Sequence, residues 1–139
     1  MNPRVDAFDH IVLTVADIDA SCAWYEQVLG MRRVTFEGDR TALLFGRQKL
    51  NLHLAGRELE PHARRPAPGT ADLCFVVSEP IGDVVAALER DGVTVELGPV
   101  ERTGAAGLMD SVYLRDPDGN LIEVASYRSR QRGSRQAAH

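Results

Sequence analysis

The sequence predicts an α+β fold made of two βαβββ modules that form a curved open sheet around a cleft, with the helices outside. The order strand, helix, strand, strand, strand occurs twice, separated by a polar segment over residues 56–69 that contains three prolines. The strands of each copy have one apolar face, and a copy of about fifty residues is too small to bury both faces of a sheet alone. The two sheets are therefore expected to pair, and the cleft is the expected place for a site.

The first module covers about residues 6–55 and begins with an alternating strand, Phe8–Val15. Asp17 has the side chain of a helix N-cap, and Gly30 suits the position just after a helix, so the helix is expected to end at Leu29. Its apolar stripe is Ile18, Cys22, Tyr25 and Leu29, at helical spacing. The remaining strands are expected over Met31–Phe36, Thr41–Phe45 and Lys49–Leu54.

The second module covers about residues 70–127 and repeats this order, so that residues 6–127 form a single domain. Its helix is expected over Ile81–Asp91, with Gly92 closing it. Strands are expected over Ala71–Val77, Val93–Leu97, Leu108–Leu114 and Leu121–Ser126, with a glycine-containing loop over Gly98–Gly107.

The last two strands are joined by a turn over Asp116–Asn120. Pro117 presets its own φ, Gly119 adopts positive φ without strain, and Asp and Asn side chains bond back to the backbone in such turns. The sequence therefore predicts a closing hairpin. Glu123 is the unusual residue in it, because it lies between apolar neighbours and a carboxylate is costly to bury without a cation or donors.

Composition excludes several classes of function. The chain has 139 residues, is 44% hydrophobic and carries a net charge of −4, which is ordinary for a globular protein. Four of its basic residues lie in residues 128–139, a segment expected to be a disordered basic tail, so the body is more acidic still. We expect no nucleic-acid partner, no membrane span, a cytoplasmic location and two reduced cysteines, Cys22 and Cys74.

Several strands place polar side chains opposite their apolar faces. Ile11, Leu13 and Val15 are expected to face the helix, so His10 faces the cleft. The same alternation directs Asp72, from the first strand of the second module, and Glu123, from its last strand, into the cleft. It also directs Asn51 and His53 there, from the last strand of the first module. The expected constellation is His10, Asn51 or His53, Asp72 and Glu123.

Imidazole and carboxylate ligands suit a divalent ion such as Zn²⁺, Ni²⁺, Mn²⁺, Co²⁺ or Fe²⁺. Two histidines and one carboxylate leave coordination positions open for a substrate or water. The sequence therefore predicts a metal site, with His10, His53, Asp72 and Glu123 as candidate ligands and Asn51 as the alternative to His53.

The opening FDHIVLTVADI, the helix SCAWYEQVLGM and the closing RDPDGNLIEVASY resemble the vicinal oxygen chelate superfamily of glyoxalases, bleomycin-resistance proteins and dioxygenases. Within it, TFEGDRTALLFGRQKLNLHLAG and GPVERTGAAG are similar to glyoxalase domain-containing protein 5-like and bacterial virulence-associated members. The resemblance implies paired βαβββ modules and a metal held by the first and last strand of each module. It also implies a small substrate that chelates the metal through two neighbouring oxygens.

The resemblance favours a metal-dependent, lactoylglutathione lyase-like enzyme, a lyase or isomerase, in which Glu123 also moves a proton. Arg102 and Thr103 are expected to position an anionic substrate, and Asn51 is a further candidate for substrate binding. Two alternatives stay open: a non-catalytic binder of a drug or toxic metabolite, and an extradiol-type dioxygenase using His10, His53 and Glu123. A homodimer is expected, because small open sheets leave edges that association commonly covers.

Overall fold

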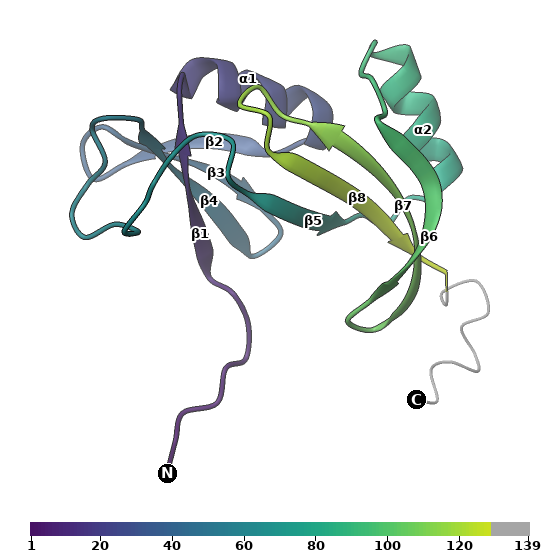
Figure 1. Cartoon of the computed structure of the whole chain (residues 1–139), viewed down its shortest axis with the longest axis horizontal. Helices are drawn as coiled ribbons and strands as arrows, with labels where there is room; N and C mark the ends of the chain where they lie inside the picture. Colours follow the sequence, from purple (N-terminus) through teal and green to yellow (C-terminus); the bar gives the residue numbers. More distant parts are fainter. Residues whose placement is uncertain (129–139) are drawn as a thin grey trace. The chain divides into compact units, whose positions relative to one another are not determined.

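The computed structural model describes residues 1–128 of the chain, an α+β protein with two four-stranded sheets (Figure 1). The elements, in order, are β1 (His10–Val15), α1 (Ile18–Leu29), β2 (Arg32–Phe36), β3 (Arg40–Phe45), β4 (Gln48–Leu54), β5 (Asp72–Val76), α2 (Ile81–Arg90), β6 (Leu97–Gly104), β7 (Gly107–Arg115) and β8 (Leu121–Tyr127). The predicted βαβββ repeat is confirmed, since each sheet has the first strand of its module beside the last.

The two sheets have the same topology. The strand order is β1-β4-β3-β2 in one and β5-β8-β7-β6 in the other. In each, the first and last strands pair in parallel and the other neighbours pair antiparallel. The chain forms two compact units: unit 1 is Met1–Ala71 with Pro117–Gly119, and unit 2 is Asp72–Asp116 with the chain from Asn120 onward.

Helix α1 has the predicted ends. The Asp17 carboxylate accepts a hydrogen bond from the Ala20 backbone N–H at 3.0 Å, which satisfies a donor that the first turn leaves without a partner. Gly30 follows the helix with a φ of 67°, and its N–H donates to the Glu26 carbonyl at 3.1 Å. Cys22 and Tyr25 from the predicted stripe are fully buried.

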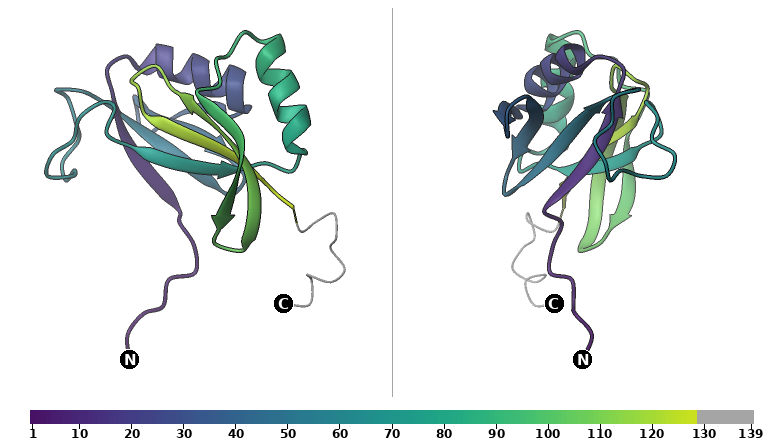
Figure 2. Two further views of the ribbon diagram at one scale, coloured as in Figure 1. Left: turned by 45° about the vertical axis from the view of Figure 1, so that its right-hand side comes forward. Right: turned by 90° about the vertical axis from the view of Figure 1, so that its left-hand side faces the viewer.

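The register of the first sheet separates two faces. Ile11, Leu13 and Val15 pair with Leu50, Leu52 and Leu54, and most of these side chains are buried. Paired residues share a face, so Val12 with Asn51 and Thr14 with His53 lie on the opposite one. The first strand begins at His10 rather than at the predicted Phe8. Asp9 accepts a hydrogen bond from the Lys49 N–H at 3.3 Å, but the strand does not extend to Phe8, which is 69% exposed. The N-terminal segment leads into β1 (Figure 2).

The second sheet buries one face. Val112, Leu114, Ile122 and Val124 are all fully buried there, and α2 packs against β7. The predicted closing hairpin is confirmed by the antiparallel pairing of β7 and β8. In its turn the buried Asp116 carboxylate accepts bonds from the Asn120 backbone N–H at 2.9 Å and side-chain amide at 2.8 Å. Gly119 has the expected positive φ, 86°.

One part of the second module differs from the prediction. Val93–Glu96 is not a strand, and most of the expected loop Gly98–Gly107 is strand β6, which pairs with β7. The Gly-Pro pair that suggests a loop instead forms a β-bulge, because the register shifts between Leu97 and Val100. A bulge keeps an irregular stretch within a sheet, so turn-type residues do not end the strand.

The end of the chain is described only up to Arg128. Its guanidinium contacts the Asp110 carboxylate, with the shortest distance 2.7 Å, and reaches Glu101 at 3.0 Å. The expected disordered tail otherwise lies outside the described residues. Among residues 1–128, neither helix is long and apolar enough to cross a bilayer.

Candidate functional site

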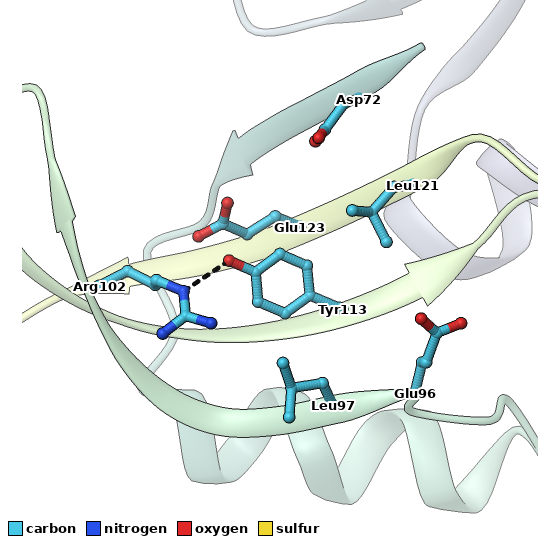
Figure 3. Close-up of a pocket in the computed structure, with 7 residues that line it drawn as sticks. All are labelled: Asp72, Glu96, Leu97, Arg102, Tyr113, Leu121 and Glu123. Atoms are coloured by element: carbon cyan, nitrogen blue, oxygen red, sulfur yellow. Dashed lines mark hydrogen bonds between the residues drawn. The ribbon is translucent and has the colours of Figure 1, made fainter. Parts of the chain in front are cut away.

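A pocket of about 360 Å³ lies on the open face of the second sheet (Figure 3). All of its lining residues belong to unit 2. They are Asp72, Glu96, Leu97, Arg102, Tyr113, Leu121 and Glu123. Its volume is at the lower end of the range for small-molecule sites, about 300–1,000 Å³.

The centre of the pocket is a row of side chains across the sheet. Glu123 on β8 pairs with Tyr113 on β7 and with Cys74 on β5, and Tyr113 pairs with Leu97 on β6. The row explains why these residues meet, because cross-strand partners point to the same face. It also separates them from Ile122 and Val124, which occupy the buried face.

Glu123 is half-buried, and its Oε2 atom is enclosed without a hydrogen-bond partner among the described residues. Cys74 on β5 is the strand partner of Glu123, so its thiol lies beside the same carboxylate. Partial desolvation of the thiol, together with the neighbouring Glu123 charge, raises the pKa of Cys74 to about 11. Cys74 is therefore a protonated thiol at neutral pH rather than a thiolate nucleophile.

Arg102 is held over the pocket by Tyr113. Its Nε donates to the Tyr113 hydroxyl at 2.8 Å, and its Nη1 donates to the Glu101 carbonyl at 3.0 Å. The guanidinium carbon lies 5.4 Å from the centre of the Tyr113 ring. Figure 3 shows the Arg102 guanidinium and the Glu123 carboxylate at the end of the pocket where the Tyr113 hydroxyl lies.

The bulge in β6 puts Arg102 on this face. Strict alternation from Leu97 would direct Glu101 into the pocket and Arg102 away from it. The extra residue between Leu97 and Val100 inverts that order, so Arg102 pairs with Met109 on the pocket side. Thr103 lies on the opposite face, opposite Leu108, and does not line the pocket.

Two further carboxylates line the pocket, in different states. Glu96 is paired with Arg115 through two hydrogen bonds of 2.9 and 3.0 Å, which lower the pKa of Glu96 and raise the pKa of Arg115. Asp72 is exposed at the start of β5, opposite Leu121. Its place on the same face as Glu123 leaves two carboxylates from neighbouring strands for a cation.

The candidate ligands of the first module lie on one face of unit 1. His10 is exposed, and its Nδ1 is 2.8 Å from the Asp9 carboxylate. Asn51 and His53 are buried, and the Asn51 Oδ1 and His53 Nδ1 atoms have no hydrogen-bond partner among the described residues. Burial and the nearby Arg40 charge lower the pKa of His53, so its imidazole is neutral, as metal ligation requires.

These donors suit a divalent ion in type, since they combine imidazole, amide and carboxylate groups with buried atoms that lack partners. Within residues 1–128 no group of three or more His, Cys, Asp or Glu side chains forms a metal cluster. His10, Asn51 and His53 belong to unit 1, whereas Asp72 and Glu123 belong to unit 2. The ligand set therefore stays a prediction, as does the choice between Asn51 and His53.

Sequence reasoning missed Tyr113, Cys74 and the Glu96–Arg115 pair. Tyr113 could have been found, because the predicted turn already sets the register of β7 on β8 and places Tyr113 opposite Glu123. Glu96 could not have been found in this way, because the sequence predicts a strand over Val93–Leu97 and the structure has none there before Leu97.

Comparisons with known proteins agree with this architecture. The family model described as the Glyoxalase/Bleomycin resistance protein/Dioxygenase superfamily matches residues 7–124. Virulence protein STM3117 of Salmonella typhimurium is 55% identical over 123 residues, which cover 88% of this chain and 85% of that protein. The glyoxalase domain-containing protein RDO1 of Mycosarcoma maydis is 50% identical over 123 residues, covering 88% and 69%.

Solved structures show the same fold. The crystal structure of the Salmonella protein aligns with a TM-score of 0.89 at 54% identity, over 90% of this chain and 99% of that chain. A lactoylglutathione lyase from Agrobacterium tumefaciens aligns with a TM-score of 0.68 at 26% identity, over 89% and 96%. TnmS3, an antibiotic binding protein from Streptomyces, shares the fold with a TM-score of 0.67 at 18% identity, over 90% and 98%.

The family match extends over nearly all of both modules, and two relatives are at least half identical to the chain over most of its length. The chain therefore belongs to the glyoxalase/bleomycin resistance protein/dioxygenase superfamily.

Proposed function

We propose that this chain is a metal-dependent lyase or isomerase of the glyoxalase type, acting on a small molecule with two neighbouring oxygens. The observation that carries the proposal is Glu123, whose Oε2 atom is enclosed without a partner beside a pocket sized for a small ligand. A buried carboxylate oxygen without a donor is costly unless a cation or substrate proton meets it. The names of one relative and one solved neighbour, which refer to a glyoxalase domain and a lactoylglutathione lyase, support the same reaction class.

The proposed ligands are His10, Asp72, Glu123 and one of Asn51 and His53. A divalent ion bound there would supply Lewis-acid polarisation of the substrate oxygens. The donor set spans hard carboxylates and borderline imidazoles, which is compatible with Zn²⁺, Ni²⁺, Mn²⁺, Co²⁺ or Fe²⁺.

The side chains of unit 2 have separate tasks in this proposal. Glu123 accepts a proton from the substrate carbon at Oε2 and returns it to the neighbouring carbon. The Cys74 thiol lies beside the same carboxylate on the neighbouring strand and restricts its rotation. The Leu97 and Leu121 side chains cover part of the pocket with apolar surface, which reduces access of water to the proton.

Glu123→Gln tests the proposal, with Glu89→Gln as the matched control on the exposed face of α2. The protein is purified without a His tag, its metal content is measured, and turnover of a hemithioacetal is followed. General acid–base catalysis contributes about 10²–10⁴-fold, so Glu123→Gln should lose at least about a hundredfold in kcat, whereas Glu89→Gln should retain it. Added metal should raise the melting temperature of the wild type and of Glu89→Gln, and raise that of Glu123→Gln much less.

If the two variants show equal kcat and an equal rise in melting temperature with metal, Glu123 is neither a metal ligand nor the proton-transfer residue. A wild type that binds no metal and turns over no substrate, yet binds small molecules, would assign the pocket to a sequestering protein instead. Ring cleavage of a catechol in place of hemithioacetal turnover would assign it to the dioxygenases.

The proposal includes a homodimer and a cytoplasmic location. The strands β1, β2, β5 and β6 end the two sheets. Such edges favour association with another copy of the chain.

A further inference from the structure

We infer that Arg102, oriented by Tyr113, is an oxyanion-binding subsite, so that the substrate carries an anionic group near its two neighbouring oxygens. The inference deepens the proposed function and rests on it for the placement of those oxygens near Glu123. It names a substrate class: a short molecule that carries a vicinal pair of oxygens and, within a few atoms of them, a carboxylate or similar oxyanion.

The Arg102 guanidinium has N–H donors that no other group of the described chain uses. Arginine carries five N–H donors, and the protein uses one on Nε, toward Tyr113, and one on Nη1, toward Glu101. No carboxylate within residues 1–128 forms an ion pair with Arg102. The remaining donors therefore have no acceptor in the described part of the chain, and a planar guanidinium matches a carboxylate in two-point geometry.

Tyr113 makes this cation a positioned one. A bond from Nε to the phenol oxygen, with the ring 5.4 Å from the guanidinium carbon, restricts a side chain that would otherwise sample many rotamers on the surface. Because the Arg102 side chain is already restricted before binding, less conformational entropy is lost when it binds a ligand. Tyr113 also pairs with Glu123 across the strands, so one residue links the proposed anion subsite to the proposed reacting end.

The other charges of the pocket leave Arg102 as the attraction for an anion. Of the seven lining residues, Arg102 is the cation and three are carboxylates. Glu96 is already compensated by Arg115, and Asp72 and Glu123 are the proposed partners of a metal ion. Among the lining side chains, Arg102 therefore supplies the attraction for an anionic group, apart from any bound metal ion.

The size of the pocket limits the ligand. A volume of about 360 Å³ holds roughly a dozen water-sized groups at ~30 Å³ each. Leu97, Leu121 and the Tyr113 ring supply the apolar surface. The pocket therefore suits a short molecule. Because Arg102 and Glu123 lie at the same end of the pocket, we infer at most a few carbons between the oxyanion and the vicinal oxygens.

The test uses matched ligands that differ in one charge. The probes are 3,4-dihydroxybutanoate, 4,5-dihydroxypentanoate and 5,6-dihydroxyhexanoate, each beside its neutral primary amide and the phosphonate of the same length. Binding is measured with saturating Zn²⁺ and without metal, both by calorimetry and by the NMR signal of the Arg102 Nε–H group. That signal is assigned from its loss in Arg102→Lys.

For at least one chain length, wild type should bind an oxyanion at least about tenfold more tightly than the amide, as expected for one charge-assisted bond, and the Nε–H signal should shift. The stronger oxyanion, carboxylate or phosphonate, identifies the class. Arg102→Gln should lose the preference, Arg102→Lys should keep part of it, and Tyr113→Phe should weaken it while preserving the fold. Arg90→Gln, an arginine on α2 that is paired with Asp91, should keep it fully.

The inference is overturned if wild type shows no preference for the charged ligand at any length, or if Arg102→Gln keeps the preference. The outcome is separate from that of the proposed function. A preference for the charged ligand without metal binding supports the anion subsite and contradicts the proposed metalloenzyme. Metal binding and turnover without a charge preference do the reverse.

Discussion

Gly98→Ala tests whether the β6 bulge positions the pocket. Gly98 has a φ of 114°, a conformation that costs a residue with a side chain about 1–3 kcal/mol. A Cβ there would lie 2.5 Å from the Ser111 carbonyl oxygen and 3.0 Å from the Val112 Cα. Both are backbone atoms of β7, a strand paired on both sides, so they cannot move without disturbing the sheet. We expect a loss of about 3 kcal/mol in the free energy of unfolding.

For a chain of this size that loss corresponds to a fall of about 10 °C in melting temperature, measured by calorimetry. Gly46→Ala is the control, because Gly46 also has positive φ, 51°, but open space around the added Cβ. It should lose only about 1 kcal/mol. The second readout is the Arg102 Nε–H signal, which should change in Gly98→Ala. Loss of the bulge would exchange the two faces of β6 beyond it and turn Arg102 away from Tyr113.

The reasoning is refuted if Gly98→Ala melts within a degree or two of Gly46→Ala and retains the Arg102 signal. Such a result would mean that β7 accommodates the methyl group and that the bulge does not determine which side chain faces the pocket.

Three further outcomes are expected. Arg128→Gln should lower the melting temperature because it leaves Asp110 without its guanidinium partner, whereas removing residues 129–139 should leave it nearly unchanged; equal effects would count against the pairing. The pKa of Glu96 is lowered by Arg115 from an ordinary value of 4.5, so this pair stabilises the fold above that pH and loses its effect as the pH falls through the lowered pKa. Melting curves of Arg115→Gln should accordingly show a weaker acid dependence than wild type, and parallel curves would contradict the assignment. Sedimentation should show a dimer at micromolar concentration, and a monomer alone would disprove the predicted association.

Short-range chemistry made much of the fold predictable. The ends of α1 follow from Asp17 and Gly30, whose capping bonds involve groups within a few residues. The closing turn follows from Asp116 and Asn120 in the same way. Period-2 alternation then placed Asn51, His53 and Glu123 on the faces opposite the apolar ones, because successive side chains of a regular strand point to opposite faces.

The errors occur where regularity ends. Gly98 and Pro99 are typical of a loop, yet they form a bulge because β7 provides backbone partners on both sides of them. Arg128 resembles the other arginines of the basic segment, but it lies where Asp110 and Glu101 face it. In both cases the deciding partner is distant in the sequence.

The sequence by itself determined the repeat, the two open sheets and the face on which Glu123 lies, because these depend on local conformation and on which strand faces are apolar. Only the tertiary structure decided that Arg102 rather than Glu101 faces the pocket, that Tyr113 holds it, and that Glu96 is neutralised by Arg115. The physical reason is that one extra residue in a strand inverts every later side chain, and that charge partners are chosen by register between strands.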